Sequence, residues 1–166
     1  MKEKFVLFKD LGIIIVPDGY VHGTRLDSFR KKNWKRFYYY NENIMDANFP
    51  NPSRILKSGD KLWIRAFKQI VFGTTTSEER MAFLATRKAV FTSAQGASLI
   101  LEQKRDQLPR GFYYVSFDKK KRLWKDADGY HGTPYVRRTL DGDCRFGLGN
   151  FESDGNDDYC LLCFCE

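Results

Sequence analysis

The sequence predicts an α+β fold, in which a small α/β unit precedes a domain of two helices and a small antiparallel sheet with long loops. Three patterns predict it: a β-branched and aromatic run near the start, two amphipathic segments in the middle, and alternating or wholly apolar runs near the end. With 166 residues, 42% hydrophobic and 16% aromatic, the chain can bury a core, which argues against disorder. The small polar stretch GTTTS at 73–77 marks a seam, so we expect two parts, 1–73 and 74–166.

In the first part, residues 5–16 (FVLFKDLGIIIV) predict one strand, or two short strands about Gly12. Thr24 can cap a helix over residues 25–36, which has a few buried apolar positions and a basic outer face. A turn then leads into a strand over residues 61–67, where apolar and polar residues alternate.

Residues 19–64 resemble a LysM module, in which a strand, two short helices and a second strand end in a short motif. Ser58 stands where the motif usually has proline, and the usual opening Gly-Asp-Thr is replaced by HGT at 22–24. The resemblance implies binding of N-acetylglucosamine polymers; a small structural unit without a ligand is the alternative. The matching residues are Asn43, Ile44, Ile55, Gly59, Asp60, Leu62 and Ile64.

In the second part, Ser77 precedes a helix over residues 78–87 whose first turn is acidic, as the positive end of a helix dipole favours. A second amphipathic helix follows over residues 95–108 and ends at Pro109 and Gly111. The run GFYYVSF that begins at Gly111 predicts a strand, and Leu123 and Trp124 anchor the chain after it.

The tail, residues 126–166, holds all four cysteines but no Lys, Met, Trp or Gln. Apolar and other residues alternate along 143–149, which predicts a strand with Cys144, Phe146 and Leu148 inward and the other residues outward. Residues 160–165 (CLLCFC) are apolar on both faces, so they predict a central strand. Between them lies a solvated loop, 152–158, in which Gly155 can take positive φ.

Charge is unevenly placed along the chain. The tail has three Arg against nine acidic residues, a net charge of −6, so the total of +7 leaves +13 for residues 1–125. The basic run beside Trp34 and the aromatic residues 37–40 is the best candidate for nucleic-acid binding, although an amphipathic helix with a solvated lysine-rich face and buried aromatic residues explains it better. We find no secretion signal and no run long enough to span a membrane, and therefore expect a cytoplasmic protein with reduced cysteines.

The segment SAQGASLILEQKRDQLPRGFYYVSFD, then LW, then a Gly- and Asp-rich tail resembles a C-type lectin fold over about residues 76–166. Such domains end in Trp-Asn-Asp, a Cys, an apolar strand and a final Cys-Glu, and here Gly155 stands in place of the Trp. The matching residues are Asn156, Asp157, Cys160, Leu162, Phe164, Cys165 and Glu166. The lack of an early partner cysteine is unlike secreted lectins. The chain is more similar to the variable proteins of diversity-generating retroelements.

That resemblance implies a protein without enzymatic activity that binds a protein or another macromolecule through diversified residues at the end of the chain. Adenine-directed substitution of AAC or AAT codons cannot produce Lys, Gln, Glu, Met or Trp, and the tail lacks four of these five types. Glu152 is an exception unless that position is fixed. We expect the following residues to be displayed: Arg137, Arg138, Thr139, Asp143, Arg145, Gly147, Gly149, Ser153, Gly155, Asp158 and Tyr159.

Other chemistries have weaker support. Zinc could bind Cys160, Cys163 and Cys165 with Cys144 or His131, but the spacing lacks paired C-x-x-C repeats. Calcium could bind the oxygens of the 154–158 loop, but the motif that completes a lectin calcium site is missing. The two histidines, His22 and His131, lie far apart in the sequence and near no recognisable nucleophile. The sequence thus predicts no catalytic residue, metal or cofactor, with glycan binding as the first alternative and nucleic-acid binding as the second.

Overall fold

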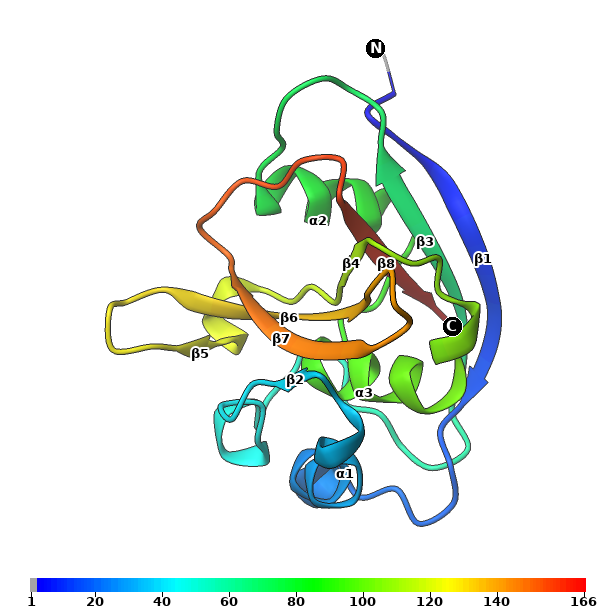
Figure 1. Cartoon of the computed structure of the whole chain (residues 1–166), viewed down its shortest axis with the longest axis vertical. Coiled ribbons are helices and arrows are strands. Elements are labelled where there is room, and N and C mark those ends of the chain that lie inside the picture. Colours follow the sequence, from blue (N-terminus) through cyan, green and yellow to red (C-terminus); the bar gives the residue numbers. More distant parts are fainter. Residues whose placement is uncertain (1–2) are drawn as a thin grey trace.

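The protein has a mixed α+β fold, seen in a computed structural model that describes residues 3–166 (Figure 1). The described residues form three α-helices and one eight-stranded sheet, in which the strands run in the order β1-β3-β8-β4-β6-β7-β2 and β5 pairs with β6. The strands are β1 (Phe5–Ile15), β2 (Tyr39–Tyr40), β3 (Lys61–Gln69), β4 (Tyr113–Val115), β5 (Trp124–Lys125), β6 (His131–Arg138), β7 (Cys144–Asn150) and β8 (Tyr159–Cys165). The helices are α1 (Arg25–Asn33), α2 (Ser77–Thr86) and α3 (Ser93–Gln103).

The strands of the two predicted parts are interleaved in this sheet. β3, from residues 1–73, lies between β1 and β8 and pairs antiparallel with both. At the far edge, β2 from the first part pairs with β7 from the second. One cluster of buried residues takes Ile14 and Ile64 from the first part and Phe146 and Phe164 from the second. The two parts therefore share one sheet and its core.

The sheet differs from the small antiparallel one predicted, because β2 is parallel to β7 and β4 is parallel to β8. The alternation of apolar residues shows which side chains face the core, but it is the same for both strand directions. Strand direction therefore had no signal in the sequence.

Most predicted elements are present with shifted ends. Strand β1 is continuous, with a register shift next to Gly12, whose φ is +74°. Helix α2 is capped by Thr76, one residue earlier than expected, in a capping box with Glu79. Helix α3 ends at Gln103, and a separate 3-10 turn follows. The second helix of the LysM layout is only a 3-10 turn, Asp46–Asn48.

Helices cover the two faces of the sheet unequally (Figure 1). On one face, α1 and α3 pack Leu26 and Ile100 into the same cluster as Ile64 and Phe164. On the other face, α2 packs Leu84 against Leu161 and other residues of β3, β4 and β8. Strand β8 is thus buried on both sides, which confirms its prediction as a central strand.

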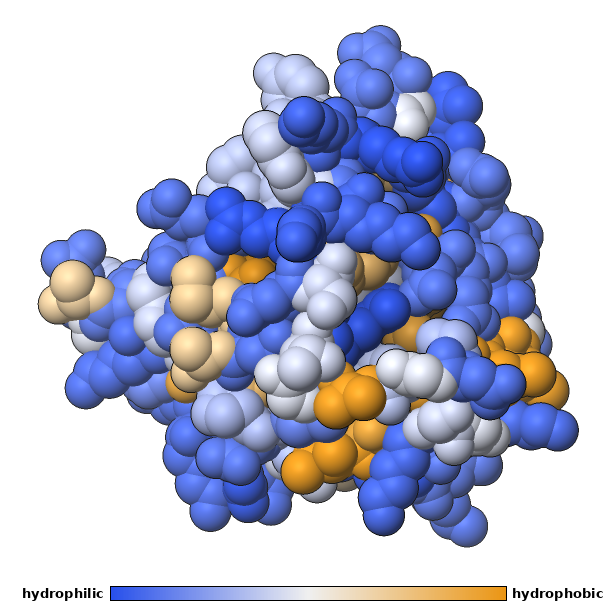
Figure 2. Space-filling view, turned by 90° about the horizontal axis from the view of Figure 1, so that it is seen from below, coloured by the Kyte–Doolittle hydropathy of each residue, from blue (hydrophilic) through white to orange (hydrophobic). Residues whose placement is uncertain are grey.

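The underside of the molecule, where α1 lies, is mainly hydrophilic (Figure 2). Apolar side chains form small groups there, one of them toward the side of β1. Near its end β1 exposes Ile13 and Ile15, and β3 places the half-exposed Trp63 opposite Ile13. These residues lie at the sheet edge farthest from β7 and β2, and hence away from most predicted display positions.

Candidate functional site

Five large side chains lie in a row across the α2 face of the sheet. Tyr159 on β8 is in register with Tyr113 on β4, which is in register with Arg137 on β6. Arg137 pairs with Arg145 on β7, and Arg145 pairs with Tyr39 on β2. Residues directly opposite each other on neighbouring strands point to the same face of the sheet. These five residues are called the Tyr/Arg row below.

Contacts within the row hold its side chains in place. The rings of Tyr113 and Tyr159 are stacked, with centroids 4.7 Å apart and planes 14° apart. Arg137 lies over the Tyr113 ring, 4.4 Å from its centroid, and its Nη1 donates a hydrogen bond of 2.8 Å to the Tyr113 hydroxyl. Tyr135, two residues before Arg137, packs edge-on against Tyr113. Because Tyr159, Tyr113 and Arg137 are held by one another, these side chains have little conformational entropy left to lose on binding.

Arg145 is the least engaged member of the Tyr/Arg row. Its guanidinium lies over the ring of Tyr38, with 4.8 Å between the Cζ atom and the centroid. The Arg145 guanidinium forms no hydrogen bond or ion pair with any residue in the range 3–166, although the residue is half-buried. A guanidinium carries five N–H donors, so Arg145 retains donors for an incoming group.

A pocket of about 70 Å³ lies on the same face of the sheet, next to Tyr159 and Tyr135. Its floor includes Thr133 on β6, which is in register with Gly149 on β7. The first turn of α2 and the 153–155 loop form the opposite wall. The pocket and the Tyr/Arg row share Tyr159, so they form one continuous surface.

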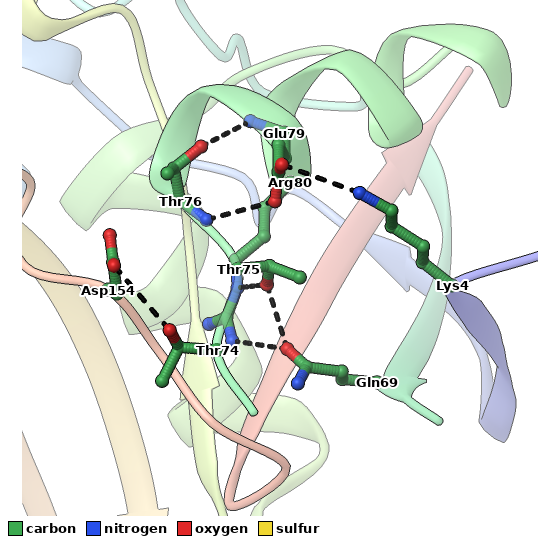
Figure 3. Close-up of polar contacts among 8 residues, drawn as sticks. All are labelled: Lys4, Gln69, Thr74, Thr75, Thr76, Glu79, Arg80 and Asp154. Atoms are coloured by element: carbon green, nitrogen blue, oxygen red, sulfur yellow. Dashed lines mark hydrogen bonds and ion pairs between the residues drawn. The ribbon is translucent and has the colours of Figure 1, made fainter. Parts of the chain in front are cut away.

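Arg80 of α2 lines this pocket and is only 3% exposed. Its Nε donates to the Thr75 hydroxyl at 2.8 Å and its Nη2 donates to the Gln69 side-chain oxygen at 3.2 Å (Figure 3). Nη2 also donates to the main-chain oxygen of Asn156. The guanidinium thereby ties together the loop before α2 and the loop before β8.

The structure exposes five of the predicted display residues at this surface. Arg137, Arg145 and Tyr159 belong to the Tyr/Arg row, and Gly149 and Ser153 line the pocket, as does the buried Gly155. Asp158 is exposed just before β8, where its main-chain oxygen accepts a hydrogen bond from the Tyr113 amide.

The other predicted display residues are placed differently. Arg138 faces the opposite side of the sheet, where its Nη1 donates to the main-chain oxygen of Asp106 at 2.9 Å. Thr139 and Asp143 close the β6–β7 turn, where they hydrogen-bond to each other. Arg138 lies outside the surface because side chains alternate along β6. The turn lies outside it because it begins after the last residue of β6.

Gly147 and Gly155 are buried rather than displayed. Gly147 lies under the ring of Tyr135, which a Cβ atom would overlap, and Gly155 lies under the guanidinium of Arg80. The expected positive φ at Gly155 is absent, and the residue instead bridges to Thr75 through main-chain hydrogen bonds. The requirement for glycine there comes from the close approach of Arg80 and not from backbone conformation.

Five residues of this surface were not predicted from the sequence: Tyr113, Tyr135, Tyr39, Thr133 and Arg80. The first two had a usable signal, because successive side chains of a strand face opposite sides, so that Tyr113 and Tyr135 would each face away from the apolar neighbour that follows in the chain. Tyr39 is in a strand of two residues, and Arg80 is 75 residues from Gly155, so no local pattern linked either to the tail.

Glu152, the exception to the composition of the tail, has a fixed structural role. Its carboxylate accepts hydrogen bonds from the main-chain N–H of His131, at 3.0 and 3.2 Å, and contacts the His131 ring. Partial burial favours a higher pKa for Glu152, but these hydrogen bonds outweigh it and lower the pKa to about 2. Glu152 therefore holds the start of β6 against the loop that follows β7.

All four cysteines are free thiols. Burial raises the pKa of Cys160 and of Cys163 to about 12, so both are protonated at neutral pH and pack as small apolar groups. Within residues 3–166 the structure has no group of three or more His, Cys, Asp or Glu side chains that could hold a metal ion.

A second hollow, of about 620 Å³, lies between α1 and the end of α3. It contains part of the basic run noted in the sequence, with Lys32 and Arg36 on one wall and Arg105 on the other. Arg25 also lines it but is paired with Glu102 of α3. Its floor is aromatic and apolar, with Phe29, Phe37 and Leu101.

None of the helices in the described part of the chain is long and apolar enough to cross a membrane. Comparisons with protein-family models, with curated proteins and with solved structures gave no match.

Proposed function

We propose that the protein is a non-enzymatic binding protein that presents the Tyr/Arg row and the adjoining pocket to a protein or another macromolecular ligand. The observation that supports it most is the row itself: five Tyr and Arg side chains from five strands on one face of the sheet. α2 packs mainly on the β3, β4 and β8 part of this face.

The composition of the row suits a binding surface. Tyr and Arg offer large flat contact areas with hydrogen-bonding ends, and both are enriched among the residues that dominate binding energy in protein interfaces. Stacking of Tyr113 on Tyr159 and of Arg137 on Tyr113 orders the side chains before a ligand arrives. Such preorganisation lowers the entropy cost of binding.

The scaffold that we propose is C-type lectin-like, with a surface diversified by a retroelement. Inward residues such as Phe146 and Phe164 are fully or almost fully buried. Arg145 and Tyr159 on the same two strands, and Arg137 on the neighbouring β6, keep part of their surface in solvent. Changes at the second set would leave the core intact. The structural role of Glu152 supports the proposal that its position is fixed and not diversified.

The neighbouring DNA tests the diversification. We expect a near-copy of the coding sequence for residues 126–166 that differs only at adenines and lies next to a reverse transcriptase gene. A genomic locus without such a repeat would contradict the retroelement origin but would leave the binding surface to be tested separately.

Binding is tested with ligands selected from a peptide or protein display library against the full chain. We expect Arg145→Gln to weaken the binding of such ligands by about tenfold to a hundredfold, because Arg145 offers unpaired donors within the Tyr/Arg row. Arg138→Gln is the matched control, since the Arg138 side chain lies on the side of the sheet opposite the Tyr/Arg row. Equal losses in both variants, measured by calorimetry, would contradict the proposal.

A second candidate function is binding of an anionic polymer in the hollow beside α1. The three cations Lys32, Arg36 and Arg105 favour it, as do the aromatic residues of its floor. A gel shift with single-stranded DNA, weakened by salt and by Arg36→Glu, would support it. The glycan alternative has less support, because β3 pairs with β8 instead of completing a separate N-terminal module.

A further inference from the structure

The charge of Arg80 has no counter-charge in direct contact. Arg80 is 3% exposed, and its partners within residues 3–166 are the neutral oxygens of Thr75, Gln69 and Asn156. Burial lowers the pKa of the guanidinium, but an arginine stays charged at neutral pH. A buried cation that forms no ion pair is unusual, because charges are removed from water at a large cost unless they are compensated.

The unused donor of Arg80 lies at the pocket. Nε and Nη2 make the hydrogen bonds described above, whereas Nη1 makes none with residues 3–166, and Figure 3 shows one guanidinium nitrogen without a contact. That nitrogen points to the side on which Asp154 lies (Figure 3), and Arg80 and Asp154 both line the pocket.

Thr133 provides a second unused donor in the same pocket. The residue is 4% exposed, and its hydroxyl oxygen is buried without a hydrogen-bond partner in the described part of the chain. A buried hydroxyl that is left unpaired costs about 1 to 3 kcal/mol, so such groups normally have a partner. Arg80 Nη1 and the Thr133 hydroxyl are thus unused donors at one pocket, and a ligand bound there can pair with both.

The size and chemistry of the pocket favour a carboxylate. A volume of about 70 Å³ suits a compact group such as a carboxylate. Arginine pairs well with a carboxylate because their planar groups match. The Tyr159 and Tyr135 rings at the wall would contact the carbon chain that carries it.

We propose that this pocket receives a carboxylate of the ligand, an Asp or Glu side chain or a chain terminus, with Arg80 and the Thr133 hydroxyl as its donors. The inference rests on the proposed function, because it assigns the chemical group that the same surface accepts. Asp154 at the rim forms no ion pair with Arg80 and is exposed, so it repels an incoming carboxylate only weakly.

The test is an NMR titration of the full chain with phenylacetate, and with the neutral isostere phenylacetamide. We expect phenylacetate alone to produce saturable shifts of the Arg80 Nε–H and Thr133 amide signals. Thr133→Val removes the hydroxyl but keeps the shape, and should weaken binding about twofold to tenfold, the worth of one hydrogen bond. Asp154→Asn removes a negative charge from the rim and should strengthen it.

Equal shifts with phenylacetamide, or no saturable shifts with phenylacetate, would overturn the inference. So would unchanged affinity in Thr133→Val or weaker binding by Asp154→Asn, since the latter would indicate a pocket for cations. These outcomes are separate from the proposed function. If library-selected ligands depend on Arg145 but phenylacetate does not bind, the binding surface is supported and the carboxylate pocket is not. If phenylacetate binds but Arg145→Gln has no effect on selected ligands, only the carboxylate pocket is supported.

Discussion

Gly149 and Gly155 both line the pocket, and of the two only Gly149 has room for a side chain. A Cβ atom at Gly149 would meet nothing closer than the Thr133 main-chain oxygen at 4.0 Å, whereas one at Gly155 would overlap the Arg80 guanidinium. Arg80 cannot move aside cheaply, because it is held by hydrogen bonds to three residues. The spatial neighbour, and not the residue type, decides which tail positions tolerate change.

We therefore expect Gly155→Ala to lower the free energy of unfolding by about 1 to 3 kcal/mol, the usual cost of an extra group in a packed site. Gly149→Ala is the matched control and should change it by less than about 0.5 kcal/mol. Urea unfolding followed by fluorescence measures both. If the two variants are equally stable, Arg80 does not constrain the loop.

Glu152 makes the stability of the fold depend on pH. Its pKa is about 2 in the folded protein, against 4.5 for a free side chain, so its carboxylate stabilises the fold above pH 4.5 and this contribution is lost as the pH falls toward 2. We expect wild type to melt at a higher temperature than Glu152→Gln at pH 6, with a difference that shrinks below pH 4.5. Glu42→Gln, at an exposed side chain that forms no ion pair with residues 3–166, should show no such difference.

At the scale of elements, the sequence predicted which segments form helices and strands but not how closely they approach. Periodicity and caps located α2, α3 and β8 to within a few residues, except that α3 ends five residues early. Close packing depends on atoms distant in the chain. Gly96 in α3 shows this, since it lies against Phe164 of β8, 68 residues later.

Gly96→Ala should lower the free energy of unfolding, although alanine favours helices by about 1 kcal/mol over glycine. A Cβ atom there would lie 2.8 Å from Thr92 Cβ and 3.0 Å from the Phe164 ring in a fully buried site, so overpacking outweighs propensity by about 1 to 2 kcal/mol. Gly23→Ala, where a Cβ meets no atom within 4 Å, is the control. A more stable Gly96→Ala variant in chemical denaturation would show that α3 can move away from β8.

At the scale of the whole molecule, the order of the strands in the sheet could not be predicted from the sequence. The seam at 73–77 has the composition of a linker, but the strands on its two sides pair with each other: β3 with β8 and β2 with β7. Local composition reports where a chain is flexible, whereas pairing depends on which apolar faces meet. The Tyr/Arg row crosses both parts for the same reason, because Tyr39 comes from the first and its partner Arg145 from the second.

This strand order makes the two halves mutually dependent. A fragment of residues 74–166 would keep β8 but lose β3, which exposes Leu162 and Phe164 and leaves the hydrogen-bonding edge of β8 unpaired. We expect the full chain to unfold in one transition and the fragment alone to lack dispersed amide signals in NMR. Mixing it with residues 1–73 should restore them, since the missing strands then return. A fragment 74–166 that folds and melts cooperatively by itself would instead establish an independent second domain, with β1 and β3 as an addition to it.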